Sequence, residues 1–472
     1  MGGDPEATQR RDHERGRSLR PLGGFSRKLA TLLLGATLAS CNSAGAVSGP
    51  SLTPPPEPAQ ESRPISSIAA RPAELSGFYR GLERLERHRG GPLRIVQLGD
   101  SHTAGDFLTE RLRELFQARF GNAGRGTMAV GLPYIGVRQV AVHIAQTGKW
   151  EYHNSLTRPD EGPYGITGFK ASSRSAGASL TLQSLDPAGF DRVEIEVLYH
   201  DNGGFLDIEV DGKRERRLLT SGTTRLARVI LDVPQGSREL RLVAADRRPV
   251  ELLSWTIERR TSGIVFDSLG VSSATISLAS HWSPEYVVNE LRHLSPALVI
   301  LAYGTNEGFQ EGFDPDKYRQ TVADTLSLVR RGAPGAAILV VGPPDAQRLT
   351  SACGGRPGAG AQASCLANPN PNRAYSCEWS TPEPLAEVRE IERRQAGAAG
   401  AVFWDWSVIM GGACAMHQWV VADPPLARGD HVHMTAAGYN RTAEALFHDL
   451  MDAYAAHHGA EFHRPPPRRS RP

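Results

Sequence analysis

Three short polar motifs, far apart in the chain, contain the residue types of a serine esterase. A Gly-Asp-Ser motif ends at Ser101 directly after an apolar run, Asn306 follows a second apolar run, and Asp430 and His433 form an Asp-x-x-His motif ahead of a C-terminal helical pattern. A serine hydroxyl becomes nucleophilic when a base takes its proton. His433 would be that base, and Asp430 would fix its tautomer. The side-chain amide of Asn306 would stabilise the oxyanion.

Each motif also has a purely structural interpretation when it is taken alone. Gly-Asp-Ser is a common capped turn, and asparagine commonly ends a strand in a turn. His433 could be a surface histidine in a helix-capping loop, and His431 is a rival base. The Asp-x-x-His spacing favours His433, and the order of the three motifs favours catalysis.

The elements that must position these residues read as an α/β core. Mostly continuous apolar runs alternate with segments of helical periodicity, which predicts a parallel sheet with helices on both faces. The predicted strands are 94–98, 297–302, 336–341 and 401–404, and the predicted helices are 108–120, 284–294, 318–330, 383–395 and 436–455.

Residues 147–260 break this rhythm with short alternating strands and turn signals such as Asp-Gly. Examples of these strands are 192–197, 206–210, 227–231 and 240–243. The pattern is typical of half-buried antiparallel sheets, so we expect a β-sandwich or jelly roll. It is inserted into the α/β domain, because Ser101 precedes it and the other motifs follow it.

The N-terminal residues read as a targeting segment. An arginine-rich stretch precedes an apolar run, 29–39, that is too short to span a bilayer as a mature helix. The sequence Leu-Ala-Ser-Cys ending at Cys41 is similar to a bacterial lipobox, so we expect an exported lipoprotein anchored through Cys41 and facing the periplasm or cell surface. An ordinary secretory signal is the alternative, and inner versus outer membrane stays open.

Composition excludes few functions, and cysteine usage agrees with export. The 472 residues carry a formal net charge of +2 without a basic face in the folded part, so nucleic-acid binding is not expected. Four further cysteines predict two disulfides with three possible pairings. These are Cys353, Cys365, Cys377 and Cys414. No pair has Cys-x-x-Cys spacing, so no metal site is expected.

The ordered motifs resemble those of the SGNH/GDSL hydrolase family. Its first block is matched by residues 99–101, its third by 304–307 with Glu307 in place of aspartate, and its last by 430–433. Its second block supplies a backbone N–H, usually from glycine, and the matching position is Ser273, with Gly270 as the alternative register. The resemblance implies a flavodoxin-like three-layer α/β/α fold. It also implies an oxyanion hole of Ser101, Ser273 and Asn306, and no metal or organic cofactor.

Within that family the chain is most similar to the peptidoglycan O-acetylesterases. The first block continues as Gly-Asp-Ser-His-Thr-Ala, and a β-rich insertion lies between the first and second blocks. The resemblance implies removal of O-acetyl groups from a cell-envelope polysaccharide, with peptidoglycan favoured, and a carbohydrate-binding-like insert. Few aromatic residues are available to stack on sugars, so the insert could instead be a structural lid. His102 lines the site or is structural.

Three other functions are compatible with the same motifs. A polysaccharide O-acetyltransferase would share the triad, and a lysophospholipase or thioesterase would prefer long acyl chains. A non-catalytic wall-binding lipoprotein would explain the departures at Ser273 and Glu307. The polysaccharide, its acetylated hydroxyl and the choice between hydrolysis and transfer stay open.

The motifs and composition divide the chain into six segments. We assign 1–40 to a lipoprotein signal peptide, 41–66 to a proline-rich tether, 67–133 and 263–458 to the hydrolase domain, 134–262 to the inserted β-sandwich, and 459–472 to a disordered basic tail. We expect a monomer.

Overall fold

The computed structural model describes residue 68 and residues 70–134, 137–349 and 379–462. The predicted signal peptide and the tether through residue 66, Cys41, and three of the four further cysteines lie outside the described residues. In the part of the chain that is described, no helix is both long and apolar enough to cross a membrane.

A five-stranded parallel sheet forms the centre of the α/β region. Its strands are β1 (Pro92–Gly99), β13 (Gly263–Gly270), β14 (Leu298–Ala302), β15 (Ala337–Gly342) and β18 (Val402–Asp405), in the order β13-β1-β14-β15-β18. β1 comes first in the sequence, β13 pairs with one side of it, and β14, β15 and β18 follow in order on its other side. This is the flavodoxin-like order, in which ligands bind beyond the carboxyl ends of the strands where the order reverses.

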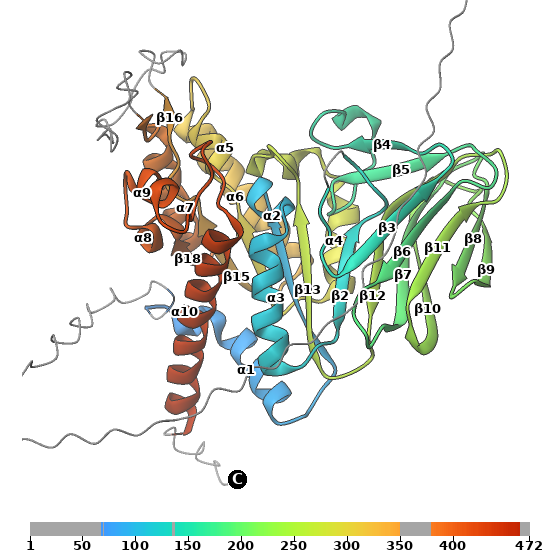
Figure 1. The fold of residues 1–472 in the computed structure, drawn as a ribbon, viewed down its shortest axis with the longest axis horizontal. Coiled ribbons are helices and arrows are strands. Elements are labelled where there is room, and N and C mark those ends of the chain that lie inside the picture. Colours follow the sequence, from blue (N-terminus) through green and yellow to red (C-terminus); the bar gives the residue numbers. More distant parts are fainter. Residues whose placement is uncertain (1–67, 69, 135–136, 350–378, 463–472) are drawn as a thin grey trace, which may run out of the picture. The chain divides into compact units, whose positions relative to one another are not determined.

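Helices cover both faces of this sheet (Figure 1). One face packs against α1 (Ser76–Glu86), α3 (Phe107–Phe120) and α10 (Ala436–Phe462), and the other against α4 (Pro284–Leu294), α6 (Pro315–Gly332) and α7 (Pro384–Ala398). Successive side chains of a strand pack into the hydrophobic cores on opposite faces of the sheet, as those of Ile95 and Val96 do. This double burial explains the continuous apolar runs and confirms the predicted three-layer fold.

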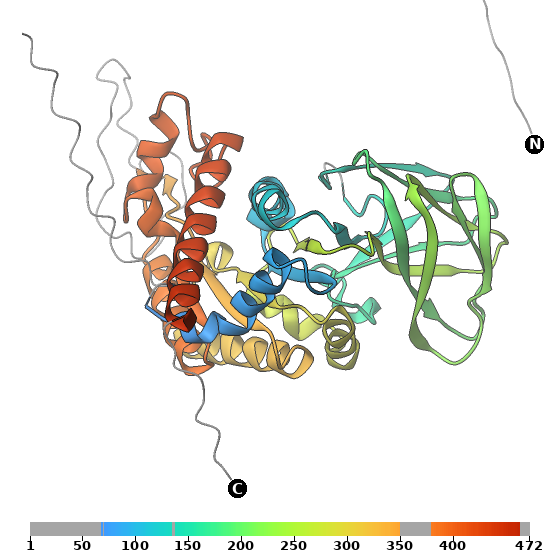
Figure 2. The same ribbon diagram turned by 90° about the horizontal axis from the view of Figure 1, so that it is seen from below.

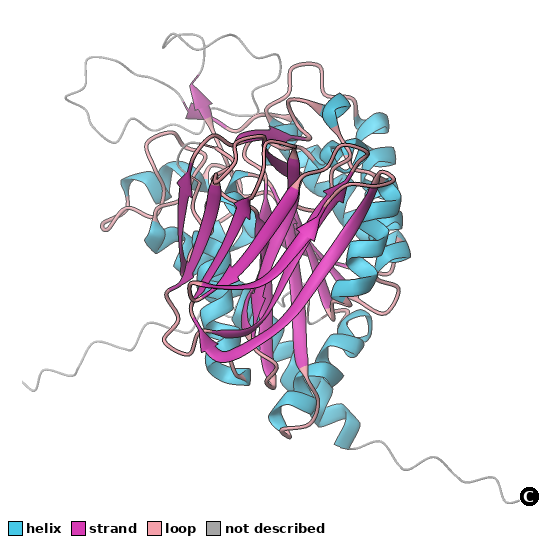
Figure 3. Ribbon diagram, turned by 90° about the vertical axis from the view of Figure 1, so that its right-hand side faces the viewer, coloured by secondary structure: helices cyan, strands magenta, loops and turns pink. Residues whose placement is uncertain are grey.

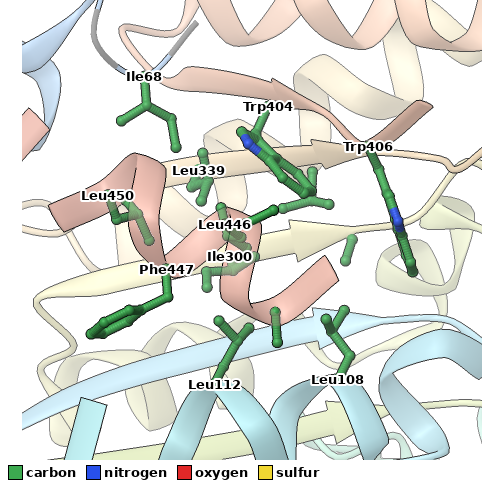
Figure 4. Packing of buried hydrophobic residues seen from close by; sticks show 14 of the residues in the cluster. Ile68, Leu108, Leu112, Ile300, Leu339, Trp404, Trp406, Leu446, Phe447 and Leu450 are labelled. Carbon is green, nitrogen blue, oxygen red and sulfur yellow. The ribbon is translucent and has the colours of Figure 1, made fainter. Parts of the chain in front are cut away.

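The core on the α10 face is filled by large side chains from sheet and helices (Figure 4). Ile300, Leu339 and Trp404 come from the sheet and meet Leu446 and Leu450 of α10. This packing fixes α10, whose first residues follow the Asp-x-x-His motif, against the central strands.

Two features of the α/β region differ from the expectation. Helix α1 was not foreseen, although its buried residues 78, 82 and 85 recur at helical spacing. Helix α10 continues to Phe462 and so includes the first residues of the tail predicted from 459. The proline run begins only at Pro465, and proline is what a helix cannot accommodate in its interior.

The inserted region is a β-sandwich of two antiparallel sheets, as predicted (Figure 2, Figure 3). The first sheet contains β10 (Arg225–Ser237), β7 (Phe190–Tyr199), β12 (Val250–Glu258), β5 (Phe169–Ser173), β4 (Glu151–Asn154) and β2 (Gly124–Ala129). The second contains β3 (Val142–Thr147), β6 (Ser179–Ser184), β11 (Glu239–Ala244), β8 (Phe205–Val210) and β9 (Lys213–Leu219). They enclose a hydrophobic core of their own.

Strand β2 belongs to this sandwich although it precedes the residues assigned to the insert. It pairs antiparallel with β12. Its sequence hides this role, because Gly124 and Gly126 have left-handed backbones, with φ of 120° and 84°, and glycine weakens a strand pattern. A Cβ on Gly124 would lie 2.7 Å from Glu258 Cα, so the close approach of the two strands requires glycine there.

Buried ion pairs join the insert to the edge strand β13. Arg94 of β1 donates from Nη1 to both carboxylate oxygens of Asp267 at 2.8 Å and also pairs with Glu258 of β12. Asp267 in turn accepts the backbone N–H of Thr127 in β2 at 2.7 Å. The insert therefore covers an open sheet edge and lies beside the end of β13.

The remaining elements are short. They are η1 (Pro72–Leu75), α2 (Ser101–Ala104), η2 (Pro159–Glu161), η3 (Ile276–His281), α5 (Thr305–Gly308), β16 (Arg348–Leu349), β17 (Trp379–Ser380), α8 (Trp406–Met410) and α9 (Ala415–Val421).

Candidate active site

Ser101 is the first residue of α2 and directly follows the turn at the end of β1. Asp100 caps this helix by accepting the backbone N–H of His102 at 2.9 Å. Gly99 has no room for a side chain, because a Cβ there would overlap Thr103 and the carbonyl of Ala302. The Gly-Asp-Ser sequence thus allows a sharp strand-to-helix turn that presents the serine beyond the carboxyl end of the sheet.

The structure brings the three predicted triad residues into one hydrogen-bonded chain. Ser101 Oγ lies 2.9 Å from His433 Nε2, and His433 Nδ1 lies 2.9 Å from Asp430 Oδ2. If Nδ1 carries the proton and donates it to the carboxylate, Nε2 is left as the acceptor for the serine hydroxyl. This is the geometry that a general base for Ser101 requires.

The loop that carries the base is held by its own aspartate. Asp430 Oδ1 accepts the backbone N–H groups of Val432 and His433, both at 2.9 Å. Partial burial raises the pKa of Asp430, but these two N–H donors and the His433 ring outweigh it, and the pKa lies below its usual value. Asp430 is therefore ionised at neutral pH and can stabilise an imidazolium at His433.

Two of the predicted oxyanion donors, Ser273 and Asn306, lie together at the loop after β13. Asn306 Nδ2 donates to the carbonyl of Ala274 at 2.8 Å, which places the amide beside Ser273. An amide nitrogen has a second N–H available for an oxyanion. Among the described residues, the backbone N–H groups of Ser101 and Ser273 have no backbone acceptor. Their contribution to catalysis stays a prediction.

The glycine preference at the second block has a backbone cause. Ser273 has a φ of +63°, the left-handed region in which glycine is unstrained. The alternative register at Gly270 falls in β13, where a Cβ would overlap the backbone of Ala104 in α2. Gly270 therefore allows the strand and the nucleophile helix to pack closely, and Ser273 occupies the turn.

Glu307 holds the two oxyanion loops together, a role that sequence reasoning missed. Its carboxyl group accepts the N–H of Ile276 at 2.7 Å and the N–H of Gly304 at 3.1 Å. The side chain is 2% exposed, and burial raises its pKa to about 7. In the sequence, Glu307 stands only as a departure from the aspartate of the family pattern. The sequence alone does not show that this carboxyl group contacts both loops.

Two neighbouring histidines are not placed to serve as the base. His102 is buried, bonds through Nδ1 to the Tyr439 hydroxyl at 2.9 Å, and has a pKa lowered to about 3 by burial and then by the nearby charge of His433. His431 stacks on Trp379 and bonds to His417 and to the Gly429 carbonyl. Burial lowers its pKa to about 4. Both are neutral parts of the framework.

A groove opens beside the triad. It is lined by Phe309, Gln347, Trp379, Asp430 and Val432, and its volume is about 330 Å³. This is within the range of small-molecule sites.

The structure describes only part of the chain in which disulfides and metal ligands are to be looked for. Cys414 is disulfide-bonded, and the other predicted cysteines lie outside the described residues, so the pairing stays open. No cluster of metal-ligating side chains is found within the described ranges.

Comparison with known proteins finds a family domain in the second half of the chain. Residues 235–441 match the model of the GDSL-like lipase/acylhydrolase family. That segment contains the second, third and last blocks but not Ser101, which the insert separates from them. A GDSL lipase of Mycobacterium tuberculosis is 29% identical over 153 residues, which are 32% of this chain and 48% of the relative. The match therefore spans about half the length of that curated relative.

A solved structure extends the likeness across the insert. A peptidoglycan O-acetylesterase is 28% identical, with a TM-score of 0.66, over 81% of this chain and 97% of that chain. Fold, block order and site geometry agree with one another. The chain therefore contains a GDSL-like lipase/acylhydrolase family domain, and over most of its length it is similar to that O-acetylesterase, with an antiparallel β-domain inserted after Ser101.

Proposed function

We propose that this protein is a serine acetylesterase that removes O-acetyl groups from a cell-envelope polysaccharide, with peptidoglycan as the favoured substrate. The observation that carries the chemistry is the chain of two 2.9 Å contacts from Ser101 through His433 to Asp430. The observation that favours the polysaccharide is the likeness to a peptidoglycan O-acetylesterase, which includes the inserted β-domain.

The reaction follows from the positions of these groups. His433 Nε2 takes the proton of Ser101, and Oγ attacks the acetyl carbonyl carbon. The oxyanion accepts hydrogen bonds from the backbone N–H groups of Ser101 and Ser273 and from the side-chain amide of Asn306. His433 then protonates the leaving sugar oxygen as its bond to the acetyl carbon breaks. Water, deprotonated by the same imidazole, attacks the acetyl-serine, and acetate leaves as Ser101 recovers its proton.

The departures from the family pattern do not favour a non-catalytic protein. Serine at position 273 retains the backbone N–H that the oxyanion hole needs, and Glu307 hydrogen-bonds to both oxyanion loops. Neither substitution removes a reacting group.

Acetate release is the direct test. The purified protein and its Ser101→Ala variant would be incubated with O-acetylated peptidoglycan and with a series of small esters from acetyl to longer acyl chains. We expect wild type alone to release acetate, with rates that fall beyond short chains. A preference for long chains would favour a lysophospholipase, and acetylation of an added sugar acceptor would favour transfer.

We also propose that the protein is exported and anchored through a lipid on Cys41. The apolar run 29–39 followed by Leu-Ala-Ser-Cys supports this proposal. Replacement of Cys41 by alanine should move the protein from the membrane fraction to the soluble fraction. Retention of the variant in the membrane fraction would contradict a lipid anchor at this position.

A further inference from the structure

A second polar cavity lies between the nucleophile helix and the inserted β-domain. The hydrolase side contributes Ala104 of α2 and Gly270 at the end of β13, and the insert contributes Arg125, Tyr134 and Gln139. Ala104 is three residues from Ser101, and the loop that carries Ser273 leaves directly after Gly270. The cavity therefore flanks the reacting groups, on the side that the insert covers.

Two buried polar atoms in the lining of this cavity, one donor and one acceptor, make no hydrogen bond to the described residues. Arg125 is 6% exposed, and it donates from Nε to Val140 and from Nη2 to Asp106. Its Nη1 is buried and has no partner among the described residues. Gln139 donates its amide to the Ala129 carbonyl at 3.1 Å, which leaves its buried Oε1 unpartnered in the same part of the chain. Unsatisfied buried polar atoms are costly.

Hydrogen bonds on both sides hold these two groups in place. Asp106 pairs with Arg113 as well as with Arg125, at 3.0 and 2.9 Å, and accepts the N–H of Val140. Arg125 is therefore fixed by a carboxylate that belongs to the turn before α3. The Nη1 atom is therefore a positioned donor, and Arg125 shares the single carboxylate of Asp106 with Arg113.

The rest of the lining is mixed, with an apolar part beside the polar residues Thr103, Asp106, Arg138, Thr167 and Ser268. Met128, Val137 and Phe169 line the cavity, and Phe169 packs against Tyr134 with ring centroids 5.8 Å apart. The cavity volume is about 30 Å³, room for two or three groups the size of a water molecule. A group with one acceptor, one donor and a methyl would match Arg125 Nη1, Gln139 Oε1 and the apolar part of this wall.

We propose that this cavity is a subsite for the acetamido group of an N-acetylated amino sugar. The acetamido carbonyl would accept from Arg125 Nη1, its N–H would donate to Gln139 Oε1, and its methyl would contact the apolar wall. The insert thereby selects the glycan whose O-acetyl group reaches Ser101. This inference rests on the proposed function, because it names the sugar class that the same site would take.

Three trisaccharides with one backbone test the proposal directly. β-1,4-linked trimers of N-acetylglucosamine, glucosamine and glucose differ only in an acetamido, ammonium or hydroxyl group at carbon 2. Binding to the full-length protein would be measured by calorimetry or by ligand-observed NMR. We expect the N-acetylated trimer to bind at least about tenfold more tightly than the other two, because the ammonium group offers Arg125 no acceptor and neither smaller group supplies the carbonyl and methyl of the acetamido group. The ammonium group would also be repelled by the positive charge of Arg125.

Variants locate the preference in the cavity. Gln139→Met removes the acceptor at similar volume, and Val137→Phe fills the cavity, so each should abolish the preference among the trimers. Gln183→Met is the matched control, since Gln183 is exposed on β6 of the same insert, and it should keep the preference. The circular dichroism spectrum and the melting temperature of Gln139→Met show whether the variant is folded, and turnover of a small acetyl ester without sugar should be unchanged in Gln183→Met.

The outcomes separate this inference from the proposed esterase activity. Equal binding of all three trimers, or a preference that survives both cavity variants, overturns the subsite and leaves the cavity to water alone. A preference that depends on Gln139 supports the subsite even if no acetate is released from peptidoglycan, in which case only the proposed reaction fails.

Discussion

The exposed triad and the buried layer beneath it use carboxyl groups in opposite ways. Asp430 has a side chain that is 47% exposed, accepts two backbone N–H groups, and has a lowered pKa. Asp100 and Glu307 are buried, and desolvation raises the pKa of each to about 7. The ionised carboxylate needed for chemistry lies at the solvent side. The inner carboxyls, largely protonated below that pH, hold backbone groups in position.

A third buried carboxyl extends the inner layer. Glu392 accepts the Tyr318 hydroxyl at 2.7 Å, and burial holds its pKa well above the usual value. Asp100 and Glu307 also act on it electrostatically, so ionising one of the three disfavours ionising the others. If the comparison is correct, changes in the outer region should affect rate, and changes in the inner region should affect stability and its pH dependence.

The largest effect is expected from removing the base of the outer region. His433→Ala should lower kcat by about 10⁴-fold or more, as in other serine triads, while the melting temperature stays close to wild type because His433 is only partly buried. His431→Ala provides the contrast. It should cost stability, through the lost stack on Trp379, more than rate. A larger loss of rate in His431→Ala would reverse the assignment of the base.

Removing the oxyanion amide should have the next largest effect. Asn306→Ala should reduce kcat about 10²- to 10³-fold with little change in KM, because an oxyanion donor acts mainly in the transition state. Steady-state kinetics on a small acetyl ester measures both constants. An increase in KM at unchanged kcat would instead assign Asn306 to substrate binding.

The buried carboxyl groups of the inner region should make the free energy of unfolding depend on pH. The pKa of Glu307 is about 7 in the folded protein against an ordinary value of 4.5, so the folded state binds more protons than the unfolded state between these values. The stability contributed by this group is present below pH 4.5 and declines as pH rises to about 7. Glu307→Gln cannot ionise and should lose less stability than wild type between pH 5 and pH 8.

Thermal unfolding at both ends of that range tests this prediction. The Gln variant should be less stable than wild type at pH 5, by about 1–3 kcal/mol, because an amide offers one acceptor oxygen where Glu307 satisfies two N–H groups. The gap should narrow towards pH 8. Glu311→Gln, at an exposed position, should follow the wild-type curve, and a constant gap for Glu307→Gln would falsify the buried titration.

The smallest effect is expected at the strained turn between the two regions. Ser273→Gly keeps the backbone N–H and relieves a left-handed φ of +63°, at the cost of a more flexible unfolded chain. Activity should be unchanged, and stability should change by less than about 1 kcal/mol. Denaturant unfolding together with ester kinetics measures both. A large loss of activity would mean that the Ser273 hydroxyl, and not only its N–H, contacts the substrate.

Much of the fold could be predicted because its periodicities are strong. The continuous apolar runs around residues 95 and 300 give the parallel strands, and the alternating runs of the insert give the sandwich. The exceptions have local causes. Strand β2 contains Gly124 and Gly126 in left-handed conformations, so its sequence resembles a loop, and its pairing with β12 is a contact over more than a hundred residues that no local pattern encodes.

The sequence by itself determined the reacting groups, since a serine after a strand, an amide after another and an Asp-x-x-His motif leave few other chemistries. It also determined that His433 is favoured over His431 by spacing alone. Only the tertiary structure decided what surrounds them. Three properties depend on desolvation and on side chains from different parts of the fold. They are the hydrogen bonds of Glu307 to two loops, the neutral state of His102 and the cavity beside Arg125. These properties arise only when distant segments pack together.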